Sequence, residues 1–295
     1  MLPFVAQPVW HFGPVTIHAF GAIVAVALWV GLWMAERRFA GAFLDPLIGH
    51  RLGGWMLFCG VLGAHLFSVL LYFPDKLSTD PWLPFRIWED ISSLGGMLGG
   101  IVGALLFFTI RAPQLSTRTR LAYLDAIAFV FPVGLAIGRL GCALAHDHPG
   151  GVTTWPLAIS LESASAQAYI LSVYDAAGQV LPSGVATMGF HDLGFYECLF
   201  LILVVIPAFF YWDRHQHSRG FYLVAFAALY LPVRFGFDFL RVADARYLRL
   251  TPAQWVAALT LASLPLVVMD RRKVRFAISG AVILATAWSC WGGPR

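Results

Sequence analysis

The sequence is short of charged residues. Only 12% of its 295 residues are Asp, Glu, Lys or Arg, whereas soluble domains usually carry about a quarter. Hydrophobic residues make up 59%, and the mean hydropathy is +0.73. This composition excludes an ordinary soluble domain and predicts an integral membrane protein.

Cysteine, positive charge and targeting signals are also scarce. Three of the four cysteines lie in apolar runs, so no disulfide framework is expected. The net charge is only +4 and the arginines are scattered, so nothing indicates binding to nucleic acid. A membrane surface is the expected partner. Residues 1–15 have neither a charged start nor a small-residue cleavage site, so we expect no cleavable signal peptide.

Eight apolar runs are long enough to cross a bilayer, for which about 20 residues are needed. They cover approximately residues 17–35, 52–73, 94–110, 121–141, 194–212, 221–240, 252–268 and 276–291. The last run contains several small polar residues, so an interfacial segment is the alternative there. The predicted fold is therefore an all-α polytopic membrane protein with one membrane domain over residues 1–295.

The basic residues predict the orientation of the spans. Twelve of the twenty Lys and Arg residues lie in the connections after the first, third, fifth and seventh runs, which are therefore predicted to be cytoplasmic. The N-terminus is then on the outer side, and with eight spans the C-terminus is there too.

The one sizeable non-membrane segment covers residues 145–192 and is predicted to lie on the outer side. Its runs 155–161 and 168–174 have a β-like composition, and residues 175–178 suit a hairpin turn. We expect a small β-containing cap over the mouth of the helices.

A lone arginine, Arg139, lies near the end of the fourth run and is soon followed by His146, Asp147 and His148. On a continuous helix, Arg139, Cys142 and His146 would face one direction. An arginine at membrane depth is costly unless it meets an anion, so it predicts a functional site. The alternative is a snorkelling arginine that only sets the depth of the helix.

A second charged group covers residues 230–241. Arg234, Asp238 and Arg241 would lie on one helix face, where Asp238 could orient one arginine and leave the other free. With Arg139 at the same depth, these residues predict a cationic pocket for a phosphate bound bidentately. The alternative is an Arg–Asp pair that only holds two helices together.

Several segments together resemble the bacterial prolipoprotein diacylglyceryl transferase family. Residues 131–141 are similar to the family signature, and residues 191–197 resemble its His-Pro-Ser-Gln-x-Tyr-Glu segment. Residues 230–241 resemble its Tyr-Gly-x-x-Arg-Phe-x-x-Glu-Phe-x-Arg helix, and residues 80–88, the Gly95-Gly96 pair and Gln254 also match. The resemblance spans about residues 17–268.

The chain departs from the family pattern at positions that handle protons or hydrogen bonds. The family's His-Gly-Gly, with a histidine implicated in catalysis, is Leu94-Gly95-Gly96 here. Both asparagines after the signature are replaced, by Cys142 and Ala145. The predicted helix over residues 274–295 would be an eighth, whereas the family usually has seven helices.

The resemblance implies a seven-helix core in the bacterial inner membrane, with a periplasmic N-terminus. It implies transfer of a diacylglyceryl group from phosphatidylglycerol to the lipobox cysteine of a prolipoprotein, with glycerol phosphate leaving and neither a cofactor nor a metal required. Arg139 and Arg234 would stabilise the leaving charge. His146 backed by Asp147, or else His191, would replace the missing histidine as the base. The expected substrate-binding residues are Gly95, Gly96, Gly138, Cys142, Tyr196, Glu197, Tyr230, Asp238 and Arg241.

Two other functions stay open from the residues alone. The lost histidine and asparagines favour a non-catalytic paralogue that binds glycerophospholipids, and a related enzyme with another acceptor is a variant of the first hypothesis. A metal-dependent hydrolase or transferase would use Cys142, His146, His148 and His191, because Cys and His one helical turn apart can share a metal.

Overall fold

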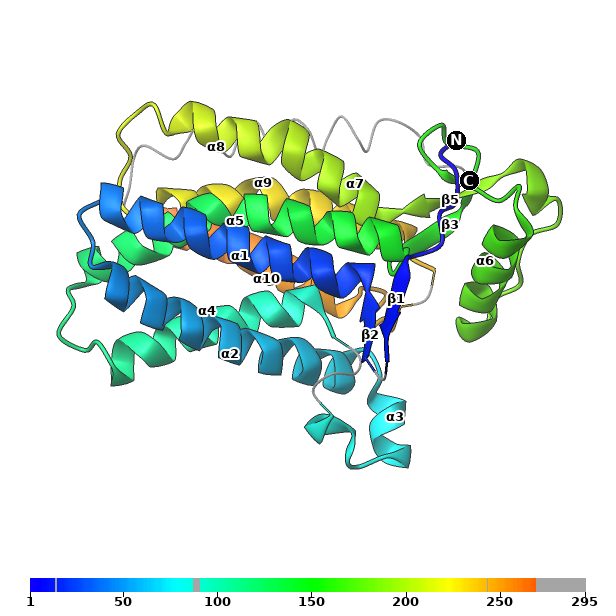
Figure 1. Ribbon diagram of the computed structural model, residues 1–295, viewed down its shortest axis with the longest axis horizontal. Coiled ribbons are helices and arrows are strands. Elements are labelled where there is room, and N and C mark those ends of the chain that lie inside the picture. The colour runs from blue at the N-terminus through cyan, green and yellow to red at the C-terminus, as the bar shows by residue number, and fades with distance from the viewer. Residues whose placement is uncertain (14, 87–90, 243, 269–295) are drawn as a thin grey trace.

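The computed structural model describes residues 1–13, 15–86, 91–242 and 244–268. Its long helices lie side by side, and the strands and short helices gather at one end of them (Figure 1). We call this end, which carries residues 149–192, the cap end. The far end carries the turns between α1 and α2, α4 and α5, and α8 and α9.

Six helical segments are long and apolar enough to cross a membrane, and they coincide with the first six predicted runs. They are α1 (Ala19–Gly41), α2 (Pro46–Leu71), α4 (Ser93–Ile110), α5 (Thr117–Ala145), α7 to α8 (Leu193–Phe200 and Ile206–Trp212, joined by a π-helical turn), and α9 (Phe221–Phe237) with the 3-10 turn Asp238–Leu240. Helix α10 (Pro252–Val268) coincides with the seventh run and has 17 residues, about the shortest length that spans a bilayer. The predicted class, a mainly helical polytopic membrane protein, is confirmed, while the eighth run lies outside the described residues.

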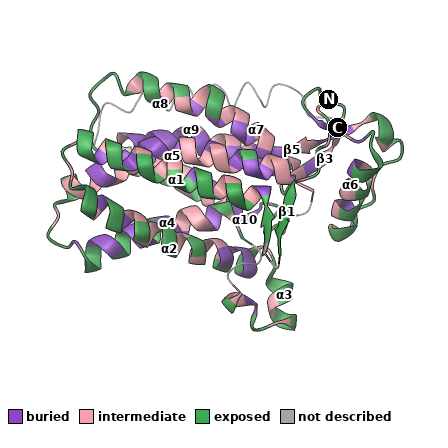
Figure 2. Cartoon of the chain, in the orientation of Figure 1, coloured by how far each residue is buried: buried purple, intermediate pink, exposed green. Residues whose placement is uncertain are grey.

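Helix α5 lies at the centre of the bundle. It is buried along much of its length, whereas α1 and α2 carry many exposed residues (Figure 2). Trp29 of α1 and Phe58 of α2 are 68% and 66% exposed. Such faces would be unfavourable in water but suit contact with acyl chains. On the inner side, the ring of Phe129 on α5 meets the ring of Tyr222 on α9 at 5.0 Å between centroids.

Helices α2 and α4 approach each other closely through glycines. A Cβ atom added at Gly95 would lie 2.5 Å from the carbonyl oxygen of Gly63. Only glycine permits this separation, which matches the close packing of small residues between membrane helices. The Gly95-Gly96 pair therefore fixes the position of the start of α4, where Ser92 caps the helix by accepting from Gly95 N–H.

The cap contains a three-stranded antiparallel sheet and one helix. Its strands are β3 (Pro149–Thr153), β4 (Ile159–Ser160) and β5 (Gly189–Asp192), in the order β3-β5-β4. Val152 and Ile159 both pair with Phe190. A separate N-terminal hairpin, β1 (Val9–Phe12) and β2 (Val15–His18), leads into α1. The short helix α3 (Pro74–Thr79) also lies at this end (Figure 1).

The strand predicted over residues 168–174 is wrong, because this segment lies within helix α6 (Ala164–Ala176). Ser163 caps the helix, and Ala166, Ile170 and Tyr174 are buried at a spacing of four residues, which is a helical period. The predicted turn at 175–178 is the end of this helix. Of the predicted strand over 155–161, only β4 forms a strand.

Candidate active site

The site is built where α7 crosses the end of α5. A Cβ atom added at Gly194 would lie 2.9 Å from the Cβ of Cys142, so glycine allows the two helices to touch. Asp192 caps α7 by accepting from Phe195 N–H at 2.9 Å. One turn beyond Gly194, this crossing brings Glu197 against Arg139.

Arg139 is 1% exposed, so it is not a snorkelling residue. Its Nε lies 2.8 Å from Glu197 Oε2. One terminal nitrogen donates to Ser93 Oγ at 3.0 Å, and the other to Cys142 Sγ at 3.7 Å. The guanidinium is therefore held between α4, α5 and α7. Ser93 adjoins Leu94, which takes the place of the family's histidine and is itself buried.

Arg234 approaches the same carboxylate from α9. Its Nη1 lies 3.1 Å from Glu197 Oε1 and 2.6 Å from Asp238 Oδ1. Tyr230 donates to Glu197 at 2.7 Å, and Thr251 donates to the other oxygen of Asp238 at 2.5 Å. The structure thus brings Arg139 and Arg234 together, with Glu197 bridging them. We call Arg139, Glu197, Arg234 and Asp238 the arginine cluster.

The arginine cluster is neutral as a whole, since it holds two guanidiniums and two carboxylates. Nε of Arg139 and Nη1 of Arg234 are buried, and their contacts lack hydrogen-bond geometry. Both nitrogens nevertheless face carboxylate oxygens as ion-pair partners, so an anion would compete with Glu197 for them.

Arg241 does not lie on the helix face that the spacing predicted. Helix α9 ends at Phe237, and Arg241 is in extended backbone with ψ 139°. Its guanidinium pairs with Asp244 at 2.7 Å, so it is not the free arginine that we expected. A bridge between Gly150 and Arg241 ties it to the cap.

The structure also corrects the prediction for His146. This residue ends α5 in the left-handed conformation with φ 51°, so it leaves the helix face shared by Arg139 and Cys142. Its Nδ1 lies 2.7 Å from Asp192 and its Nε2 lies 3.2 Å from the Val5 carbonyl oxygen. Because both ring nitrogens face acceptors, His146 is held as a buried structural contact, and Asp192 rather than Asp147 supports it.

Two other histidines lie in or beside the cap sheet, His191 in β5 and His148 directly before β3. His191 Nδ1 lies 3.0 Å from the hydroxyl of Tyr196, and partial burial lowers the pKa of His191. Burial and the charges of Arg241, Arg139 and Arg234 hold the pKa of His148 well below its usual range. Both rings are therefore neutral near pH 7, as a proton acceptor must be.

A cleft of 510 Å³ opens between the start of α1 and the end of α5. The N-terminal hairpin and the start of α1 line one side of it, and Ala145 and Asp147 line the other. Nearby, Gly138 faces open space, because a Cβ atom there would meet nothing within 4 Å.

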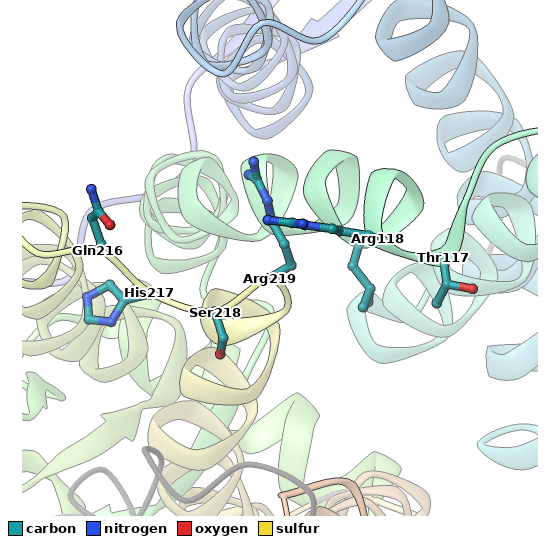
Figure 3. Close-up of a pocket in the computed structure, with 7 residues that line it drawn as sticks. Thr117, Arg118, Gln216, His217, Ser218 and Arg219 are labelled. Carbon is teal, nitrogen blue, oxygen red and sulfur yellow. The ribbon is translucent and has the colours of Figure 1, made fainter.

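A larger cavity of 680 Å³ lies at the far end, between the start of α5 and the connection before α9. Figure 3 shows Arg118 and Arg219 extending toward each other there, with Thr117, Gln216, His217 and Ser218 around them. None of the predicted site residues lines this cavity. Its basic residues belong to the connections that predict the cytoplasmic side.

Comparisons with known proteins indicate the family of the chain. A model of the family "Prolipoprotein diacylglyceryl transferase" matches residues 7–269. The chain belongs to this family. Phosphatidylglycerol–prolipoprotein diacylglyceryl transferases of Chromohalobacter salexigens and Paenarthrobacter aurescens are each 28% identical to it, over 88% and 90% of this chain and 91% and 82% of theirs. Transferase 1 of Streptomyces coelicolor is 26% identical over 92% of this chain and 74% of its own.

Several residues of the site could not be recognised from the sequence pattern. Ser93 and Thr251 are polar residues at helix starts, which by pattern alone predict only caps. Asp192 was not singled out beside His191, although an Asp before an apolar run is a signal for an N-cap. That it also binds His146 depends on the packing of the cap, which no local pattern contains.

Proposed function

We propose that this chain transfers a diacylglyceryl group from phosphatidylglycerol to the cysteine thiol of a prolipoprotein or a related acceptor, at the outer face of the inner membrane. The observation that carries the proposal is the pair of buried arginines from two separate helices that meet at one carboxylate. Guanidiniums bind phosphate oxygens in the geometry with which they bind carboxylates. A lipid phosphate would therefore share these donors with Glu197 or take its place.

The family to which the chain belongs implies the reaction. The acceptor thiolate attacks the glyceryl carbon that bears the phosphate, so that a sulfur–carbon bond forms and the carbon–oxygen bond breaks. Glycerol phosphate leaves with the electron pair. Arg139 and Arg234 stabilise the negative charge that grows on the phosphate, in a site without bulk water where such contacts are strong. Exposed apolar faces of the helices would contact the acyl chains.

A transfer assay tests this function. Purified protein in detergent is given phosphatidylglycerol and a lipobox peptide, and the peptide is analysed by mass spectrometry. We expect a diacylglyceryl adduct on the cysteine, which Arg139→Ala and Arg234→Ala should abolish. Arg118→Ala is the matched control, because it removes an arginine at the far end. An adduct formed equally well by all variants would contradict the role of the arginine cluster.

A lipid-binding paralogue is the second candidate, and one observation favours it. The position of the family's histidine holds the buried apolar side chain of Leu94. Both ring nitrogens of His146 already contact acceptors, Asp192 and the Val5 carbonyl oxygen. Phosphatidylglycerol that binds but is never consumed, with any lipobox peptide, would favour this reading over the transferase.

A further inference from the structure

Three residues with metal-binding side chains meet just beyond the arginine cluster. The Sγ of Cys142, a carboxylate oxygen of Asp147 and a ring nitrogen of His148 all lie within 4.8 Å of one another. We propose that these residues bind one divalent metal ion of the zinc type, and that this ion activates the acceptor thiol. The second half rests on the proposed function, whereas the metal site itself does not.

The end of α5 creates this grouping. On a continued helix, Asp147 would lie about 140° around the axis from Cys142. The left-handed His146 instead reverses the chain, and the N–H of Asp147 returns to the carbonyl oxygen of Cys142 at 3.4 Å. The carboxylate then lies next to the thiol, and His148 follows it directly. A left-handed residue at a helix end is strained without glycine, so this turn depends on the contacts of His146.

The contact between His148 and Asp147 has the features of two ligands of one ion. Nδ1 of His148 lies 3.1 Å from Asp147 Oδ1, yet this buried nitrogen makes no hydrogen bond among the described residues. In a tetrahedral zinc site, ligand atoms lie about 3.3–3.6 Å apart, given bond lengths of about 2.0–2.3 Å. The nitrogen and oxygen already approach this spacing, and the sulfur would need to move by about 1 Å.

Most of the charged groups around these three residues are already paired. Each neighbouring arginine has a carboxylate partner, and each neighbouring carboxylate other than Asp147 has a cationic or histidine partner outside the group. These pairs are Arg139–Glu197, Arg234–Asp238, Arg241–Asp244 and His146–Asp192. Asp147 pairs only with His148 among the described residues. A carboxylate and a thiolate together neutralise one divalent ion.

Three protein ligands leave one tetrahedral position open, as in zinc sites that bind a substrate. Asp147 lines the 510 Å³ cleft, so the open position can be reached from there. An acceptor thiol bound at this position loses its proton to water in the cleft. Its sulfur then attacks the glyceryl carbon as proposed above, with no change in oxidation state. This arrangement supplies the thiolate that the family's missing histidine would otherwise help to form.

Cobalt binding tests the site on the full-length chain. Protein stripped with a chelator is titrated with Co²⁺, and we expect one ion per chain with a thiolate-to-cobalt charge-transfer band. Cys142→Ser should abolish this band, and Cys198→Ser should keep it, because Cys198 is buried on the adjacent α7 and its thiol donates to Ala136. Asp147→Asn, at an exposed position, should weaken binding at least about tenfold. No band in the wild-type protein, or a band that persists in Cys142→Ser, would overturn the site.

Turnover separates this inference from the proposed function. Stripped protein should not modify a lipobox peptide, and added Zn²⁺ should restore the modification. Turnover that is unchanged after metal removal overturns the role of the ion and leaves the transferase in place. A cobalt site with no turnover, with or without zinc, overturns the proposed function and leaves the metal site in place.

Discussion

Replacement of Glu197 by glutamine tests whether the arginine cluster is an anion site. Glutamine keeps the size of the side chain and an acceptor for Tyr230, but it removes the charge shared by Arg139 and Arg234. Arg234 keeps Asp238 as its partner. Arg139 loses the one carboxylate within ion-pair distance among the described residues, and it has no access to water.

The expected loss of stability in Glu197→Gln follows from the burial of the ion pair. Removal of one partner of a buried ion pair costs about 3–5 kcal/mol, because the remaining charge stays unpaired in a low dielectric. The retained amide oxygen places the Glu197→Gln loss near the lower value. A lipid phosphate should replace the missing charge. At a lipid concentration of about 100 times Kd, binding to the folded state alone adds about 2.7 kcal/mol, so phosphatidylglycerol should recover most of the lost stability.

The assay is thermal unfolding in detergent with added phosphatidylglycerol or zwitterionic phosphatidylcholine. We expect Glu197→Gln to unfold at a lower temperature than wild type and to be stabilised more than wild type by phosphatidylglycerol. Glu162→Gln removes the same charge from an exposed position of the cap and should behave as wild type with either lipid. If Glu197→Gln matches wild type, or if both lipids stabilise it equally, the anion-site argument is refuted.

Three further predictions address the arginines, the orientation and the histidines. Arg139→Lys and Arg234→Lys should each lower turnover at least about tenfold, because an ammonium cannot form the bidentate fork; near-normal turnover would leave them as structural anchors. Cysteines introduced into residues 163–178 should react with an impermeant reagent on intact cells, and labelling only after lysis would reverse the predicted orientation. His146→Ala should destabilise the fold by about 1–3 kcal/mol because the buried Oδ2 of Asp192 loses its partner, whereas His191→Ala should lower turnover without that loss. Since burial lowers the pKa of His191, turnover that uses its neutral ring should persist to a lower pH than an ordinary imidazole would allow and fall only with further acidification.

The helices were predictable because membrane spanning imposes a simple pattern. Runs of about 20 apolar residues that are separated by connections rich in arginine indicate membrane spans. Six of these runs agree with the structure. The start of α4 is similarly predictable, because Ser92 followed by the glycine pair carries both a cap signal and a packing signal. These features depend on local sequence alone.

The ends of helices were harder to predict. No glycine follows Ala145, so nothing in the sequence signals that α5 stops there, and a continued helix placed His146 on the wrong face. Helix α6 shows the opposite failure, because its Tyr, Ile and Val residues are typical of strands. Burial of Ile170 and Tyr174 against the cap sheet decides its conformation. Both errors concern segments whose structure depends on tertiary contacts rather than on propensity.

The pairing within the arginine cluster could not have been read from spacing either. The sequence placed Asp238 on the face of Arg234, which the structure shows, but it gave no indication that Glu197 would lie between two arginines more than 90 residues apart. That contact requires α7 to cross α5 at Gly194. Cys142 contacts Gly194 at this crossing and lies one helical turn from Arg139 on α5, so it connects the cluster to the proposed metal ligands.

The neutrality of the arginine cluster constrains how an anionic lipid can bind. If a phosphodiester entered beside Glu197, the cluster would carry one excess negative charge. At an effective dielectric of about 20, two like charges 4 Å apart repel by about 4 kcal/mol. Glu197 must therefore move away, take up a proton or be balanced by another cation when the lipid binds. A metal ion held by Cys142 and Asp147 brings no net charge of its own, so it cannot serve as that cation. Displacement or protonation of Glu197 is then the step that opens the site, and Glu197→Gln, which is already uncharged, should bind phosphatidylglycerol more tightly than wild type while releasing glycerol phosphate more slowly.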